Sequence, residues 1–299
     1  MSKKKYRDTG AEYTSRKPIL YTKKDKTLYV LQTAGAILVT LIMVFPVYWM
    51  IVTSFKSGNV LLTKELNLLP DALNLDNYIE ACTRVPLFRY ILNTIAVTVI
   101  IMILKLTTGV LAAYGFARGR FWGRDVLFYV ILGAMMVPHQ VIFVPVYVLC
   151  SKLGWVDTFA GLVLPSAVAP HFIFMLRQSF KSVDDSYVEA GKIDGLGTLG
   201  AIIRIMVPMC KATLITASLN TFITSWNSYF WPKIITQSDK IRVISVGLVH
   251  LRESWNGVAM WQHTNVTMAG CVITMIPAVI LFFVFQKYML TGYSKMAMK

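Results

Sequence analysis

One polar stretch between long apolar segments holds the residues best suited to binding another protein. Asp185 can cap the start of a short helix, and Gly195 can end it, because glycine adopts the left-handed conformation without strain. The small residues Ala190 and Gly191 would let a partner approach this helix closely. The stretch therefore predicts an exposed helix that docks against a partner.

A second short helix is expected in the same loop, which spans residues 180–208. Thr198 can cap its start, and it should stop before Pro208, because proline disrupts a helix interior. Gly195-x-Gly197-x-x-Gly200 also matches the glycine pattern of dinucleotide-binding proteins. That pattern needs a preceding strand within a βαβ unit, and here it follows a helix, so we interpret it as a connecting loop.

A single charged residue, Lys105, lies in the middle of an apolar segment. At that depth in a bilayer a charge costs roughly 2.5–3.5 kcal/mol, so the side chain needs water, a ligand or a partner. Lys105 either faces a pathway that carries water or an anionic molecule, or it pairs with a carboxylate or a carbonyl of a neighbouring subunit. The sequence leaves both interpretations open.

The segments around these residues are those of a membrane protein. Of the 299 residues, 56% are hydrophobic and 15% are charged, with a mean hydropathy of +0.57, whereas soluble domains carry about 25% charged residues. The apolar residues form blocks of about 20, the length that crosses a bilayer core as a helix. We expect an all-α polytopic membrane protein with six transmembrane helices, kinked at their prolines. The expected spans are Leu28–Ser54, Ile91–Phe116, Val126–Cys150, Thr158–Leu176, Ala212–Trp226 and Met268–Gln286.

Six spans place both termini on one side of the membrane, and the basic residues decide which side. The net charge is +15, and most Lys and Arg residues flank the apolar blocks, which indicates a membrane rather than a nucleic-acid partner. With the N-terminus inside, the cytoplasmic segments hold most of these residues, largely because of the Lys-rich tail. The expected organisation is a cytoplasmic tail at 1–27, a six-span domain at 28–290 and a cytoplasmic tail at 291–299.

Other kinds of site are not indicated. No GxxxxGK[ST] pattern and no nucleophile–base arrangement can be identified, so we expect no catalytic residue and no cofactor bound by this chain. Neither the cysteines nor the histidines show metal-ligand or disulfide-framework spacing. These residues are Cys82, Cys150, Cys210, Cys271, His139, His171, His250 and His263.

The loop resembles the signature of permease subunits of ATP-binding-cassette (ABC) importers, which reads E-A-A, three residues, G, nine residues, I-x-L-P. Glu189-Ala190-Gly191, Gly195 and Ile205-x-Val207-Pro208 fit this spacing without a gap, with Gly and Val as mild departures. The resemblance extends over nearly the whole chain beyond residue 40. Within the family, the sequence is most similar to the second permease of maltose-type carbohydrate importers. The segments that carry it include Ala112-Ala113-Tyr114-Gly115-Phe116-Ala117-Arg118, Met136-Val137-Pro138, Leu176-Arg177-Gln178, Ser225-Trp226-Asn227, Trp231-Pro232 and Gln286-Lys287-Tyr288.

The resemblance implies a role and a set of partners. In the family this loop is the coupling helix that docks on the ATPase subunit, which implies that role for Glu189, Ala190, Gly191, Asp194 and Gly195. The implied partners are a homologous second permease, two ATPase subunits that hold ATP and magnesium, an extracellular or periplasmic binding protein, a carbohydrate substrate and membrane lipid. The C-terminal tail, ending Met296-Ala297-Met298-Lys299, lacks the last glycines of the family pattern, which implies a weaker role for it.

The predicted fifth span and its end carry candidates for contact with the substrate. Asn220, Trp226 and Asn227 offer amide and aromatic groups, which suit the hydroxyls and C–H faces of sugars. The alternative for each is packing between helices or in an interfacial aromatic belt. Three other functions stay open: an ABC permease for an acidic oligosaccharide or a sugar phosphate, an ion-coupled secondary transporter, and a nucleic-acid or structural membrane adaptor.

Overall fold

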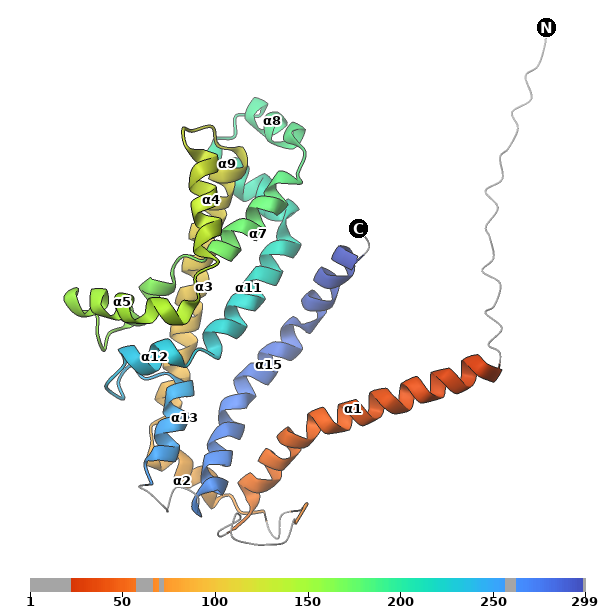
Figure 1. The fold of residues 1–299 in the computed structure, drawn as a ribbon, viewed down its shortest axis with the longest axis vertical. Coiled ribbons are helices and arrows are strands. Elements are labelled where there is room, and N and C mark those ends of the chain that lie inside the picture. Colours follow the sequence, from red (N-terminus) through yellow and green to blue (C-terminus); the bar gives the residue numbers. More distant parts are fainter. Residues whose placement is uncertain (1–22, 58–66, 70–72, 256–261, 298–299) are drawn as a thin grey trace. The chain divides into compact units, whose positions relative to one another are not determined.

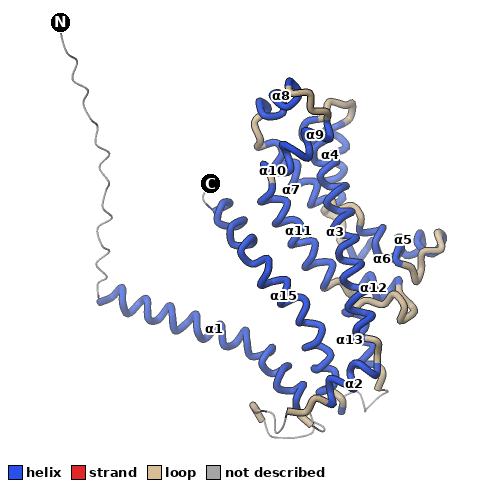
Figure 2. Tube along the Cα trace, turned by 180° about the vertical axis from the view of Figure 1, so that it is seen from behind, coloured by secondary structure: helices blue, strands red, loops and turns tan. Residues whose placement is uncertain are grey.

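The computed structural model describes residues 23–57, 67–69, 73–255 and 262–297, and every regular element in these ranges is a helix (Figures 1 and 2). This confirms the all-α prediction for the described chain. The chain divides into two compact units, Met1–Trp49 and Met50–Lys299. Most of the expected N-terminal tail, residues 1–22, and the last two residues lie outside the described residues.

The described part of the first unit is helical from Lys23 and belongs to helix α1, Lys23–Phe55, of 33 residues. Helix α1 continues through Pro46, and its apolar side chains are exposed over most of the circumference, for example at Leu31, Leu41 and Met43. The part from Thr27 to Phe55 is long and apolar enough to cross a membrane. A helix that is apolar on all sides needs lipid or protein around it, in agreement with the predicted first span.

The second unit is organised around helix α3, Leu87–Arg118, which has 32 residues and a length of roughly 48 Å at 1.5 Å per residue. It contains the predicted span Ile91–Phe116. Helices α7, Pro170–Lys181, and α11, Lys211–Trp226, pack against it (Figure 1). The packing is close at Gly109, where a β-carbon would lie 2.2 Å from the Phe172 ring. The core between these helices contains Ala113, Phe172, Leu176, Phe180, Met206 and Ala217.

The predicted third span is two helices rather than one kinked helix. Helix α4, Arg124–Ala134, ends before residues 135–138, and helix α5, His139–Lys152, begins after Pro138. Pro138 lacks an N–H group and pushes the residue before it out of the helical conformation, so the helix breaks here instead of bending.

The predicted fourth span is also interrupted. Helix α6, Phe159–Val163, and the 3-10 turn Leu164–Ser166 form one arm, and α7 forms the other, at an angle of 43°. Pro165 lies at the start of the 3-10 turn, and Pro170 lies at the start of α7. The first N–H groups of a helix have no partner within the helix, so the missing N–H group of proline costs no hydrogen bond there.

The predicted fifth span corresponds to α11, but the short helix before it continues further than expected. Helix α9, Thr198–Ala201, leads into a π-helical turn, η2, Ile202–Met206, and then into α10, Val207–Met209. The expectation that the helix stops before Pro208 is wrong, because helical backbone continues from α9 through η2 and past Pro208 to Met209. Helices α10 and α11 then meet at a bend of 84°.

The last predicted span lies within α15, Thr264–Ala297, which extends beyond it at both ends. By length and composition, two helices of the described chain can cross a membrane unbroken, α1 and α3, and four can if each bent pair counts as one span. Shorter apolar helices occupy Gln140–Lys152 and Thr264–Ile280. The fold is therefore a helical one with several candidate membrane spans.

The sequence did not predict three short helices. Helices α2, Asp76–Arg84, and α13, Ile244–Glu253, lie at the Leu87 end of α3, whereas α12, Phe230–Ile235, contacts α5 and α6. Buried amides fix the Leu87 end of α3. Asn93 of α3 donates two hydrogen bonds of 3.0 Å to the carbonyls of Lys240 and Arg242. The predicted docking loop lies at the opposite end of α3, beside Arg118.

Candidate functional site

The predicted docking helix is present as α8, Asp185–Ile193. Its cap is Asp184, one residue before the expected Asp185, and the Asp184 carboxylate accepts a 2.8 Å hydrogen bond from the N–H of Ser186. Hydrogen bonds from Ser186 hold the pKa of Asp184 below its usual range. Asp185 is instead the first helical residue, where its negative charge interacts favourably with the helix dipole and stabilises the helix.

Gly195 ends α8, as the sequence predicted. Its φ of +81° is left-handed, and its N–H donates a 3.0 Å hydrogen bond to the carbonyl of Lys192. The N–H of Leu196 donates a 2.9 Å bond back to the carbonyl of Gly191. These two bonds form a Schellman motif, in which the residue at this position is usually glycine. The turn fixes the direction in which the chain leaves α8.

The two faces of α8 differ in exposure. Glu189, Ala190 and Asp194 are exposed, and Ile193 at the end of the helix is 87% exposed. Val188 and Gly191 are buried against the following segment. Ala190 is therefore exposed, whereas Gly191 faces the subunit itself: a β-carbon there would lie 2.5 Å from Cδ1 of Ile205 in η2.

Arg118, the last residue of α3, connects α3 to the start of α8. Its guanidinium forms an ion pair with Asp185 and donates hydrogen bonds to the carbonyls of Phe180, at 3.0 Å, and Val183. Sequence reasoning did not select Arg118 as a site residue. Its partners are far from it along the chain, and no local pattern indicates the contact.

A second arginine, Arg177 of α7, joins the same end of α3 to α4. Its side chain lies 3.8 Å over the ring of Phe128 and donates a 3.2 Å hydrogen bond to the carbonyl of Phe116. A guanidinium buried in this way is stabilised by the aromatic face as well as by the hydrogen bond. The ends of α3, α4 and α7 are therefore fixed to one another.

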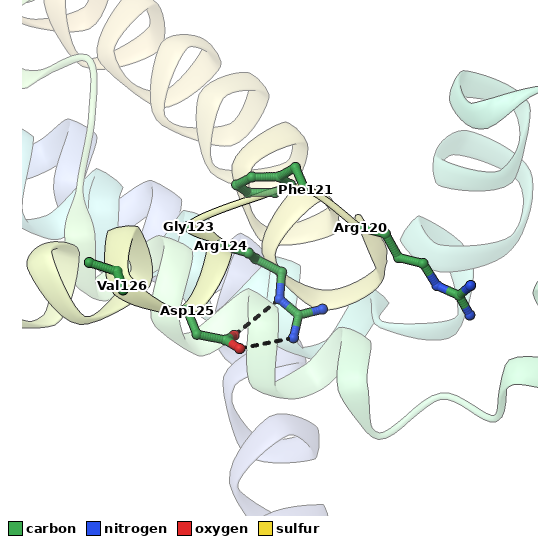
Figure 3. A pocket seen from close by; sticks show the side chains of 6 residues that line it. All are labelled: Arg120, Phe121, Gly123, Arg124, Asp125 and Val126. Atoms are coloured by element: carbon green, nitrogen blue, oxygen red, sulfur yellow. Dashed lines mark hydrogen bonds and ion pairs between the residues drawn. The ribbon is translucent and has the colours of Figure 1, made fainter.

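A pocket of about 270 Å³ lies beside this junction, in the turn between α3 and α4 (Figure 3). Arg124 binds Asp125 through two contacts of 3.0 and 3.2 Å, while Arg120 projects away from that pair (Figure 3). The hydrogen bonds from Arg124 lower the pKa of Asp125. None of the residues predicted to contact a substrate lines this pocket.

The predicted pathway residues lie on two helices. Lys105 is half-buried on α3, between the buried residues Ile101 and Gly109 one turn to either side, and within the described chain it forms no hydrogen bond or ion pair. Asn220 is exposed on α11. No hydrogen bond or ion pair among the described residues joins Lys105 to the candidates on α11.

The other two candidates lie at the end of α11. Asn227 is exposed, and its amide donates a 2.9 Å hydrogen bond to the carbonyl of Ile223. Trp226 is only 6% exposed and stacks on Phe222 with 5.7 Å between ring centroids. Trp226 therefore packs inside the subunit, as the alternative interpretation had it, while the two asparagines remain accessible. No group of His, Cys, Asp or Glu side chains suited to a metal ion occurs within the described residues.

Comparison with known proteins identifies the class. The family described as "Binding-protein-dependent transport system inner membrane component" matches residues 105–294, well over half of the chain. The chain belongs to this family, so it is a multi-span inner-membrane permease subunit of a binding-protein-dependent ABC importer, and not an enzyme. Membership excludes the ion-coupled transporter and the adaptor.

Individual relatives align over most of the chain. The arabinooligosaccharides transport system permease protein AraQ of Halalkalibacterium halodurans is 29% identical over 265 residues, covering 88% of this chain and 93% of its own. The sn-glycerol-3-phosphate transport system permease protein UgpE of Rhizobium meliloti is 29% identical over 259 residues, covering 84% and 91%.

A solved structure has the same fold. A chain from the crystal structure of a bacterial ABC transporter involved in the import of the acidic polysaccharide alginate matches with a TM-score of 0.80. The match has 24% identity and covers 91% of this chain and 99% of the other.

Proposed function

We propose that this permease imports an oligosaccharide as the second, AraQ-like permease of its complex. The observation that carries the proposal is the alignment with AraQ proteins over nearly their entire length, in H. halodurans and again in Bacillus subtilis, where 29% identity covers 85% of this chain and 90% of the relative. The maltose-type resemblance of the sequence supports the same substrate class.

The proposed complex contains six transmembrane helices from this chain, with both termini in the cytoplasm. A homologous second permease completes the pathway, two ATPase subunits bind ATP and magnesium, and an external binding protein delivers the substrate. Closure of the ATPase subunits moves α8 and opens the pathway outward, and hydrolysis resets it. Such alternating access needs no covalent intermediate.

In this proposal α8 is the coupling helix. Glu189, Ala190 and Asp194 form the exposed face that meets the ATPase subunit, together with the exposed end of the helix at Ile193. Two glycines determine how α8 is placed. Gly195 sets the direction in which the chain leaves α8, and Gly191 allows α8 to pack closely on η2.

The proposed pathway surface includes Lys105, Asn220 and Asn227, with Trp226 supporting it from inside the subunit. Exposed amides can exchange hydrogen bonds with sugar hydroxyls as the substrate passes. A Lys105 side chain that has no partner within the described chain favours a second candidate, an anionic substrate. The relatives include a glycerol-3-phosphate permease, and the solved neighbour imports an acidic polysaccharide.

Uptake into proteoliposomes tests both candidates. The complete complex with its binding protein is reconstituted with ATP inside, and arabino-oligosaccharides, alginate oligosaccharides and sn-glycerol 3-phosphate are offered in turn. ATP-dependent uptake of the neutral oligosaccharide alone supports the first candidate. Uptake restricted to one of the two anionic compounds supports the second, and uptake of none of the three would reject both substrate classes as represented by these probes.

A further inference from the structure

Helix α8 contacts the rest of the subunit along α9 and η2 and, at its first residue, through Arg118 of α3. Gly191 packs on Ile205 of η2, and this segment continues through α10 into α11. Arg118 joins Asp185 at the other end of α8 to the last residue of α3. Val188 is buried in the same cluster as Met206 of η2, and the residues of α8 other than Val188 and Gly191 are exposed. The packing on η2 and the contact with Arg118 therefore carry most of the motion that α8 can transmit.

The contact at Arg118 lies across a turn that could otherwise bend. Helix α7 ends at Lys181 and α8 begins at Asp185, so only residues 182–184 separate the helices. Helix α7 already packs along α3. Without a further contact, α8 could pivot on this turn while α7 and α3 stayed in place.

Arg118 binds both sides of that turn. The carbonyl of Phe180 lies before it, the carbonyl of Val183 lies within it, and the carboxylate of Asp185 lies after it. The Arg118 side chain is 14% exposed, against 73% for Asp185, so the guanidinium is sheltered while its acidic partner is not. A planar guanidinium can hold several acceptors in fixed directions at once, which a lysine ammonium does not do as well.

We infer that Arg118 is a positioning residue that makes α8 and α3 move as one body when the ATPase subunits close. This rests on the proposed docking of α8. Lys105 lies on the same helix, roughly 20 Å from Arg118 at 1.5 Å per residue. A displacement of α8 is therefore delivered to the middle of α3 through Arg118, in addition to the packing of η2, which contacts α3 and continues toward α11.

The test measures whether α8 and α3 keep a fixed distance during the ATPase cycle. In a background without the four native cysteines, spin labels are placed at Leu111→Cys and Tyr187→Cys, which are exposed on α3 and α8. Double electron–electron resonance is recorded on the complete complex in nanodiscs, without nucleotide and after trapping with ATP and vanadate. We expect one narrow distance distribution that is the same in both states.

Two variants remove the connection and one controls for lost charge. Arg118→Gln should broaden the distribution and shift it by several ångströms on trapping, and uptake per ATP hydrolysed should fall severalfold. Asp185→Asn removes only the ion pair at an exposed position, so it should act in the same direction without risk to folding. Arg120→Gln removes a nearby arginine that projects away from the junction and should behave as the parent protein (Figure 3).

A distribution that stays narrow and unchanged in both Arg118→Gln and Asp185→Asn would overturn the inference. If the Arg118→Gln complex does not assemble, the Asp185→Asn variant decides alone: a broadened and shifted distribution supports the inference, and a narrow, unchanged one overturns it. The docking role of α8 is read independently, from retention of the ATPase subunits in a Gly195→Val variant. Retention there combined with an Arg118-dependent distance would reject the docking role and keep the connection between α8 and α3.

Discussion

Gly191 and Ile205 are in such close contact that a β-carbon at position 191 would lie 2.5 Å from Cδ1 of Ile205. This contact lets α8 lie directly on the π-helical turn η2. A glycine in the third position of the loop signature, where the family usually has alanine, is therefore matched by the isoleucine that packs on it. The signature constrains a packing contact as well as an exposed surface.

Gly191→Ala should loosen α8. Overpacking of a well-filled site costs about 1–3 kcal/mol, and the clashing atom here is the terminal methyl group of a side chain that can shift, so we expect a cost toward the lower end of this range. We expect a lower melting temperature for the detergent-purified complex and faster proteolysis between residues 182 and 200. Gly191→Ala combined with Ile205→Val, which removes the clashing methyl group, should recover both. A single variant as stable as the parent protein would show that the contact is not tight.

Gly195→Val should weaken the hold on the ATPase subunits. A left-handed conformation costs a residue with a side chain about 1–2 kcal/mol, and a β-branched residue more, so the end of α8 would unwind or turn away. Co-purification of the ATPase subunits should fall severalfold while the chain remains inserted. Gly197→Ala is the matched control, because Gly197 has an ordinary φ of −70° and a β-carbon there meets nothing within 4 Å. Equal recovery of the ATPase subunits in both variants would contradict the docking role.

Lys105→Met should leave the complex assembled, because Lys105 has no hydrogen bond or ion pair within the described chain that its loss would break. If the substrate is anionic, uptake should fall at least tenfold while ATP hydrolysis continues, and Lys105→Arg should retain part of the uptake. If the substrate is neutral, uptake should change little. Failure of Lys105→Met to assemble would identify a structural partner in the second permease instead.

Cysteine labelling should place the two ends of α3 on opposite sides of the membrane. In a cysteine-free background, Arg120→Cys and Lys192→Cys should react with an impermeant maleimide only after the cells are opened. Asp239→Cys, near the other end of α3, should react in intact cells, since the Tyr90 hydroxyl bonds to Asp239 at 2.7 Å. Labelling of Lys192→Cys in intact cells would overturn the proposed orientation.

The sequence predicted those elements that depend on composition and on local conformation. The apolar blocks identified α1 and α3, and a left-handed glycine identified the end of α8. Local patterns did not indicate the Arg118–Asp185 pair, which depends on how α3 and α7 pack. The break before Pro138 was also missed, because block length measures hydrophobicity and says nothing about which backbone groups are hydrogen-bonded.

The break at residues 135–138 limits what can surround this part of the protein. Met136 is 86% exposed in the single subunit, and the backbone here is not helical. Acyl chains offer no hydrogen bonds, so irregular backbone at membrane depth must lie against protein or water. A lipid-soluble photoreactive probe should therefore label the outer faces of α3 and α4 and leave this stretch unlabelled in the assembled transporter. The edge of that unlabelled region would trace where the annular lipid ends.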